Sequence, residues 1–124
     1  MLLSQAILLG SMLSRQGFGG QGVIETRCAL ETACDVIGAK VGYDKLLTET
    51  ARHWPWTDET HVIYPCATND TTTHRVLSVI WMLNDHERWT RPRIAAWVAT
   101  VEPPEPLLLE HKLTVVQENE PCTV

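Results

Sequence analysis

The residues that could perform chemistry lie in two places, a predicted loop around Cys66 and a polar corner at positions 84–89. Cys66 is the one cysteine placed like a nucleophile, because the other three fall in a predicted helix or in the C-terminal tail. A nucleophile needs an activating base and an orienting acid. His61 and His74 are five and eight residues away, and this spacing does not establish that they meet Cys66. The sequence assigns no catalytic residue, and we expect a protein that is not an enzyme.

Metal binding is the next chemistry open to these side chains. The candidate ligands are Cys66, His61, His74, His86 and Asp85. Structural zinc sites usually contain close pairs such as Cys-x-x-Cys or His-x-x-x-His, and no pair in this sequence has that spacing. We therefore predict no metal and no cofactor, with a small metal-binding protein as the third functional alternative.

The polar corner contains the second group of candidate residues. Its binding hypothesis rests on Asn84, Asp85, His86, Arg88 and Trp89, which adjoin one another in the sequence. Asn and Asp favour turns because their side chains bond to nearby backbone amides, and Asp85 can pair with neighbouring arginines. A purely structural corner is the alternative to a polar contact site, and the sequence favours the structural interpretation.

A further candidate contact is the aromatic segment His53-Trp54-Pro55-Trp56. Pro55 must end the helix that precedes it, because proline lacks an amide proton and clashes with the preceding turn. The two tryptophans either pack beneath the rest of the domain or form an exposed patch that meets a partner protein. Trp54 and Trp56 therefore join the predicted binding residues.

Both corners depend on a central helical hairpin at residues 76–101. Its first arm carries apolar residues at offsets of one, four and seven, the spacing of one helix face. These residues are Val76, Leu77, Ile80 and Leu83. Trp81 and Met82 widen the apolar surface, which predicts a helix buried on more than one side. Threonines 71–73 offer hydroxyls that can cap its first turn.

The second arm should begin at Thr90, whose hydroxyl can cap a helix, with Pro92 in the first turn, where a missing amide costs nothing. It must end by Glu102, because three prolines follow within four residues. Trp89 precedes the cap, and we expect it to pack back on Ile94 as a hydrophobic staple.

The N-terminal half contains the elements that must support this hairpin. A first helix is predicted from a cap at Ser4 to about Ser14, and Gly10 inside it marks the close approach of another helix. The glycine-rich segment 16–22 is a loop. A short strand at residues 61–64 could pair with residues 23–24.

Two more helices follow from their end signals. One runs over residues 27–37 and ends at Gly38 in a left-handed conformation. The other runs over residues 45–52, after a cap at Asp44. Together with the hairpin, these elements predict a mainly α fold, a small bundle of about five helices, with or without a minor two- or three-stranded sheet.

Composition bounds the domain organisation. At 124 residues, of which 44% are hydrophobic, the chain is one domain with a sizeable core. That domain covers residues 1–102. Residues 103–124 form a proline-rich tail with apolar runs at 107–109 and 113–116, and this tail either docks on its own domain or adds to a partner.

The charge pattern argues against several classes of partner. A net charge of −5 is not that of a nucleic-acid binder, which would normally show a basic patch. A cluster of arginines around the hairpin is interrupted by Asp85 and Glu87, which predicts a solvated face with ion pairs. These arginines are Arg75, Arg88, Arg91 and Arg93. The apolar N-terminal run is too short to cross a bilayer and lacks the layout of a secretory signal. We therefore expect a cytoplasmic protein with free thiols and no membrane partner.

The segment WMLNDHERWTRPRIAAWVATVE at residues 81–102 resembles the C-terminal signature of a family of small bacterial and phage proteins of unknown function. In that family Leu-Asn-Asp is followed by Trp-Thr-Arg and Ile-Ala-x-Trp-Val. The segments Cys28–Gly38 and His53–Trp56 fit the same family in order. Similar proteins often carry two cysteines where this chain has Pro65-Cys66, so the resemblance does not extend to a metal site. It implies the helical fold and a phage- or prophage-like setting, and no activity.

These observations predict a non-enzymatic accessory protein, phage- or prophage-like, that acts by binding another protein. Its expected contacts are the two tryptophan corners and the apolar tail. The alternative is a structural or assembly protein, such as a virion component, that forms homo-oligomers through residues 103–124. The partner is thus another protein or a second copy of the chain.

Overall fold

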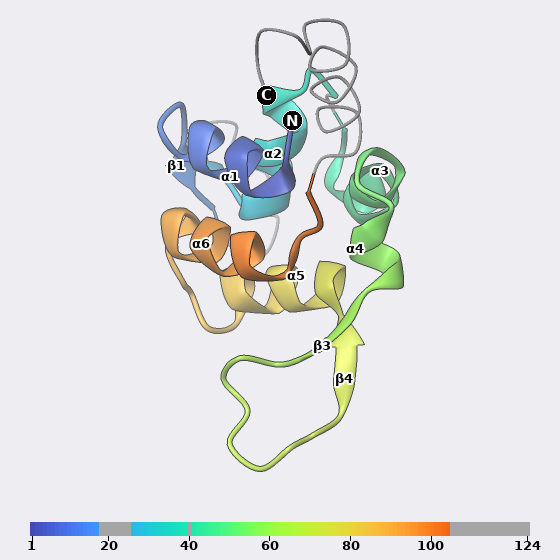
Figure 1. Cartoon of the computed structure of the whole chain (residues 1–124). Coiled ribbons are helices and arrows are strands. Elements are labelled where there is room, and N and C mark those ends of the chain that lie inside the picture. The colour runs from blue at the N-terminus through green and yellow to red at the C-terminus, as the bar shows by residue number, and fades with distance from the viewer. Residues whose placement is uncertain (18–25, 40, 105–124) are drawn as a thin grey trace, which may run out of the picture.

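The computed structural model describes residues 1–17, 26–39 and 41–104, of which 56% are helical (Figure 1). The helices are α1 (Leu3–Ser11), α2 (Ala29–Val36), α3 (Leu46–His53), α4 (Trp56–Glu59), α5 (Val76–Asp85) and α6 (Arg91–Val101), with a 3-10 turn, η1 (Tyr43–Lys45). The strands are β1 (Arg15–Gln16), β2 (Thr26–Arg27), β3 (His61–Ile63) and β4 (Thr73–Arg75). The predicted mainly α bundle with a minor sheet is confirmed. The tail prediction, beyond its first two residues, lies outside the described part of the chain.

Two short pairs of strands accompany the helices. β1 and β2 are parallel, with Arg15 opposite Thr26, and β3 and β4 are antiparallel, with His61 opposite Arg75. The predicted strand at 61–64 thus forms, but its partner is β4, because a short connection returns the chain beside it. The expected partner at 23–24 lies outside the described residues. Figure 1 shows β3 and β4 extending away from the helices on the α5 side.

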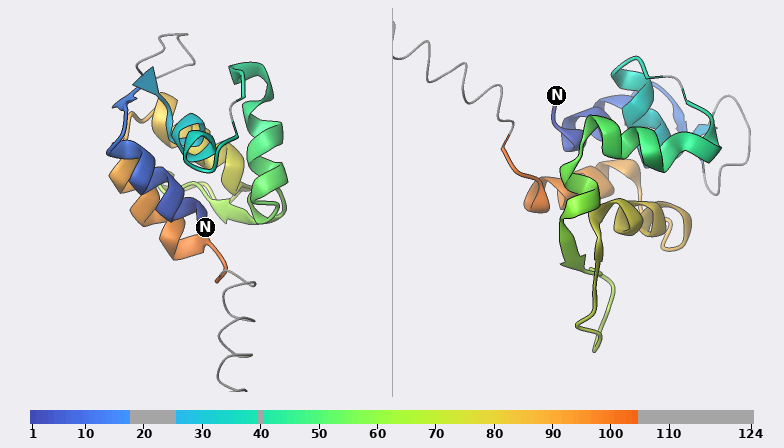
Figure 2. Two further views of the ribbon diagram at one scale, coloured as in Figure 1. Left: turned by 90° about the horizontal axis from the view of Figure 1, so that it is seen from above. Right: turned by 90° about the vertical axis from the view of Figure 1, so that its right-hand side faces the viewer.

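The core forms where α1 packs against both α2 and α6, and Figure 2 shows α1 and α6 side by side. The largest fully buried apolar side chains are Leu3, Ile7, Leu30, Ile80, Leu83 and Ile94. A β-carbon added at Gly10 would lie 2.5 Å from the Thr32 hydroxyl oxygen, which is closer than packed atoms approach. The prediction that Gly10 marks the close approach of two helices is confirmed.

α6 runs antiparallel to α1 and places a charge at each of its ends. At the start of α1, the Glu102 carboxylate accepts hydrogen bonds from the Ser4 amide, at 3.1 Å, and from the Ser4 hydroxyl. At the end of α1, the Arg91 guanidinium donates to the carbonyl oxygens of Ser11 and Ser14. An anion at a helix N-terminus and a cation at its C-terminus both suit the helix dipole. Two predictions are therefore wrong: Ser4 does not cap α1, and Arg91 is buried rather than solvated.

Three caps follow the local sequence. The Cys28 sulfur accepts a hydrogen bond from the Glu31 amide, and the Glu31 carboxylate accepts one from the Cys28 amide, which is a capping box at the start of α2. Gly38 follows α2 with φ of 81°, and the predicted left-handed cap is confirmed. The hydroxyl of Thr90 accepts from the Arg93 amide at 3.3 Å, which confirms the predicted cap of α6.

Other predicted boundaries are wrong. Asp44 lies inside η1 and does not cap α3, because the 3-10 turn winds directly into that helix. The sequence predicted no helix at residues 56–59, but these residues form α4, which Pro55 precedes with helical backbone angles. Threonines 71–73 do not cap α5, because β4 leads straight into it and Arg75 is the residue at the cap position.

Candidate functional site

The predicted polar corner is centred on a side chain that the fold uses internally. Asn84 is 1% exposed. Its amide oxygen accepts hydrogen bonds from the Ala29 amide and the Gln16 side chain, each at 3.1 Å. Its amide nitrogen donates to the Gly17 carbonyl, at 3.0 Å, and to the Asp85 carboxylate, at 2.7 Å. Asn84 therefore joins α5 to β1 and to the start of α2, and its role as a contact stays a prediction.

Asp85 links this buried junction to the surface. Besides the bond from Asn84, its carboxylate accepts a hydrogen bond from the indole nitrogen of Trp81, at 2.6 Å. The two residues are one helical turn apart on α5, so the carboxylate holds the indole in one orientation. Trp81 is 40% exposed. The prediction that Trp81 and Met82 widen a buried surface is wrong, because Met82 is exposed to a similar extent.

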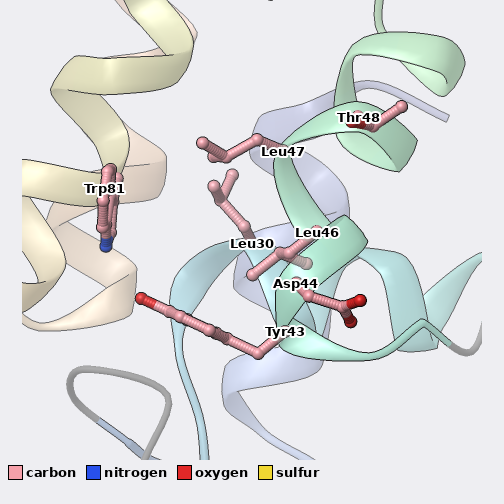
Figure 3. A pocket seen from close by; sticks show the side chains of 7 residues that line it. All are labelled: Leu30, Tyr43, Asp44, Leu46, Leu47, Thr48 and Trp81. Atoms are coloured by element: carbon pink, nitrogen blue, oxygen red, sulfur yellow. The ribbon is translucent and has the colours of Figure 1, made fainter.

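Trp81 forms one wall of a pocket of about 330 Å³ between α5 and the η1–α3 segment (Figure 3). The pocket is lined by Leu30, Tyr43, Asp44, Leu46, Leu47, Thr48 and Trp81. Figure 3 shows the hydroxyl end of Tyr43 directed towards Trp81, with the leucine side chains to one side of both. An apolar concavity with aromatic walls and few polar groups is the usual form of a binding site for one side chain or a small ligand.

The electrostatic character of this pocket is acidic. Partial burial raises the pKa of the Tyr43 hydroxyl above its ordinary value, and the negative charge of Asp85 raises it further. Asp44 contributes a carboxylate to the pocket lining itself. Both effects favour a neutral or cationic group beside the aromatic walls over an anion.

The rest of the polar corner does not converge on this pocket. The side chains of His86 and Arg88 are exposed, and Arg88 has φ of 56°, which turns the chain between α5 and α6. Trp89 is half-buried against the core, and the Arg93 guanidinium lies 3.8 Å from the centre of its ring. The staple between Trp89 and Ile94 stays a prediction. Asp85, of the predicted corner, is hydrogen-bonded to Trp81, which lines the pocket.

The aromatic corner divides between its two tryptophans. Trp54 is 6% exposed, and its indole nitrogen donates to the Met1 carbonyl at 3.0 Å. The side chain fills the space between α3 and the N-terminus, and the role of Trp54 as a contact stays a prediction. Trp56 is half-buried against the core, and its role as a contact stays a prediction.

A second pocket, of about 300 Å³, lies between α5 and the β3–β4 connection. It is lined by Tyr64, Ala67, Asp70, His74, Ser78, Val79 and Met82. Tyr64 donates to the Glu87 carboxylate at 3.2 Å, and its pKa is raised by burial and by that negative charge. Hydrogen bonds from Thr72 lower the pKa of Asp70. Its lining places Asp70, His74 and Ser78 beside the Tyr64 hydroxyl.

Cys66 stands beside the second pocket and is exposed. Desolvation raises the pKa of its thiol, and the negative charge of Glu87 raises it further. A cysteine nucleophile requires the opposite effect, because the thiolate is the reactive form. Within residues 1–17, 26–39 and 41–104, no three His, Cys, Asp or Glu side chains are placed to hold a metal ion. Cys28 and Cys34 are buried free thiols, as predicted, and Cys122 lies outside the described residues.

Sequence reasoning missed the residues of the first pocket, which come from α2, η1, α3 and α5. The available signal was Trp81, a large aromatic residue beside a carboxylate one turn away and off the main apolar stripe of its helix. In the part of the chain that the structure covers, no helix has the length and apolarity to span a bilayer. Comparison of the chain with family models, curated proteins and solved structures gave no match.

Proposed function

We propose that this chain is a protein-binding module whose contact surface is the Trp81 pocket. The observation that carries the proposal is an exposed indole, held by Asp85, that walls an apolar concavity of about 330 Å³. Exposed tryptophans in a rigid setting are typical binding hot spots, because they bury a large area while losing little conformational freedom.

The pocket chemistry defines the class of partner. Its floor of leucines suits one apolar or aromatic side chain. The carboxylates of Asp44 and Asp85 suit a basic residue next to that anchor, which could also lie over an aromatic face. The partner is thus a protein segment with an apolar anchor adjacent to lysine or arginine. The accessory role in a phage or prophage belongs to the same proposal and rests on the resemblance of residues 81–102.

The test is selection of binding peptides from a displayed random library on the immobilised full chain. The selected sequences should share an apolar or aromatic anchor beside a basic residue. Affinities of synthesised peptides, measured by fluorescence anisotropy, should fall about tenfold or more for Trp81→Ala. Asp44→Asn should weaken binding chiefly at low salt, since it removes one charge from the rim.

Met82→Ala is the matched control. Met82 adjoins Trp81 on α5 and is 42% exposed, but it lines the other pocket. Peptides should bind this variant and the parent chain equally. Loss of binding in Met82→Ala with retention in Trp81→Ala would move the contact to the second pocket and refute the proposal, as would peptides that bind all three chains alike.

A further inference from the structure

The outward side of α1 is unusually apolar for a surface helix. Leu3, Ile7 and Gly10 are buried in the core, whereas a second group of apolar residues, on α1 and in the turn that follows it, is exposed. This group, named here the α1 outer face, consists of Leu8, Leu9, Met12 and Leu13, all of which are exposed. Met12 is 71% exposed, and the first fourteen residues carry no charged side chain. A helix that is apolar on all sides is normally covered on all sides.

The C-terminal tail starts at the N-terminal end of α1, the helix that carries this face. The carboxylate of Glu102 is bonded to the Ser4 amide at the beginning of α1, so the chain leaves the domain at that end of the helix. Figure 2 shows the end of α6 next to the N-terminus. Pro103 and Pro104, the last described residues, are exposed. The position from which the tail departs is therefore fixed by the bond between Glu102 and α1.

The length and sequence of the tail match the α1 outer face. Helical rise places Leu8 about 6 Å and Met12 about 12 Å beyond Ser4 along the axis. A proline-rich connection of five residues, from Glu102 to Leu107, spans up to about 16 Å. The first apolar run of the tail, Leu107–Leu109, thus arrives within reach of the exposed leucines, and the second run at 113–116 follows it.

We propose that residues 107–116 pack across the α1 outer face of their own chain. The short connection favours packing within one chain over packing between two copies, because a tether of this length gives the tail an effective concentration at its own α1 on the order of millimolar. Packing would remove four exposed apolar side chains from water and cover the apolar tail in the same step. This surface is separate from the Trp81 pocket, so the two proposals stand or fall independently.

Paramagnetic broadening in the full chain tests this placement. A nitroxide is attached at Glu110→Cys in a Cys66→Ser, Cys122→Ser background, where the two remaining cysteines are buried. The amide signals of Leu8, Leu9 and Met12 should lose most of their intensity relative to the reduced label. The signals of β3, at the far side of the domain in Figure 1, should keep theirs. Full intensity throughout α1 would overturn the proposal.

Variants of the face distinguish specific packing from proximity alone. Leu8→Ser with Met12→Ser replaces two exposed residues, so the domain should keep its fold, and the broadening should largely disappear. Ile63→Ser is the matched control, because Ile63 is an exposed apolar residue on β3, and broadening should be unchanged. Broadening that survives the double replacement would contradict the proposal.

An experiment with mixed chains distinguishes packing of the tail on its own chain from packing on a second copy. Isotopically labelled chains without nitroxide are combined with unlabelled chains that carry it, and the α1 signals should then remain sharp. Broadening of the α1 outer face in the mixture would assign the tail to a neighbouring copy. That result would overturn packing within one chain and support the homo-oligomer instead.

Discussion

At the scale of single residues, the polar corner owes its shape to Asn84. Each of its four hydrogen bonds reaches a different residue, and those residues come from segments far apart in the sequence as well as from the adjacent Asp85. An amide is required because the site needs an acceptor for Ala29 and donors for Gly17 and Asp85. A carboxylate would supply the acceptor but would leave the Gly17 carbonyl without its donor and repel Asp85.

We expect Asn84→Ala to lower the free energy of unfolding by roughly 1–3 kcal/mol, because it leaves a buried amide and a buried carbonyl without partners. Urea denaturation followed by tryptophan fluorescence measures the change. His86→Ala, two residues further on and exposed, should alter stability by less than about 0.5 kcal/mol. Equal effects of the two substitutions would show that Asn84 is not the structural centre of the corner.

Gly38 is a residue whose role depends on its backbone conformation. The amide of Gly38 bonds to the Asp35 carbonyl, and the amide of Ala39 bonds to the Cys34 carbonyl. With φ of 81° at Gly38, this is a Schellman motif at the end of α2. A β-carbon there would meet open space, so the constraint is conformational and not steric.

Gly38→Ala should therefore destabilise the domain by about 1–2 kcal/mol, through the cost of the left-handed conformation for a residue with a β-carbon. Gly38→Asn should cost less, because asparagine adopts this conformation more readily. Midpoints of chemical denaturation for both variants check the order. Alanine as stable as glycine would mean that the loop adopts another backbone in solution.

At the scale of elements, α6 carries charges that suit its neighbour better than itself. Arg91 lies in its first turn and Glu102 at its end, each opposite to the preference of its own helix dipole. Both charges bond to the ends of α1, where the signs are favourable. The antiparallel pairing of α1 and α6 is thus specified by electrostatics at both ends as well as by the apolar contacts between them.

This arrangement predicts two independent losses. Glu102→Ala should cost about 1 kcal/mol, as for the loss of a helix N-cap, and Arg91→Met roughly 2 kcal/mol, because buried carbonyls lose a charged donor. The two sites are separated by the length of α1, about 13 Å. Their effects in the double variant should add to within about 0.5 kcal/mol. Stronger coupling in urea denaturation would show that α6 detaches from α1 as a unit.

The elements also show which predictions a sequence supports. The caps at Thr90 and Gly38 were predicted correctly because caps depend on residues within one or two turns, and the close approach at Gly10 because a glycine inside a helix marks such a contact. The exposure of Trp81 was not predicted, because periodicity identifies an apolar helix face but does not show which neighbouring element covers it. The Glu102 cap of α1 joins residues 98 positions apart, and no local pattern points to such a pair.

At the scale of the whole molecule, the two pockets lie on either side of α5 and share no residue. They arise because η1 and α3 approach α5 from one side and the β3–β4 connection from the other. The candidate site could not be predicted from the sequence for this reason: its walls come from four elements whose mutual placement depends on the packing of α1, α2 and α6.

Burial of weak acids across the domain predicts sensitivity to alkaline pH. Burial raises the pKa of the Cys28 and Cys34 thiols above the ordinary value of 9.0, and raises the pKa of Tyr43 and Tyr64 as well. Above pH 9 the unfolded chain therefore releases protons that the folded chain retains. The unfolded state then binds fewer protons than the native state, so the free energy of unfolding must fall as pH rises.

Cys28→Ser isolates one contribution to that loss. A serine hydroxyl can accept the Glu31 amide in the same capping box but does not titrate in this range. We expect the variant to be about as stable as the parent at pH 7 and to lose less stability between pH 9 and 11, as measured by urea denaturation at each pH. Cys66→Ser, at an exposed position, should reduce the loss of stability between pH 9 and 11 by less than Cys28→Ser does. If stability declined in parallel in the parent and in Cys28→Ser, the Cys28 thiol would titrate alike in the folded and unfolded chains. That result would contradict the prediction, which rests on the burial of Cys28 at the start of α2.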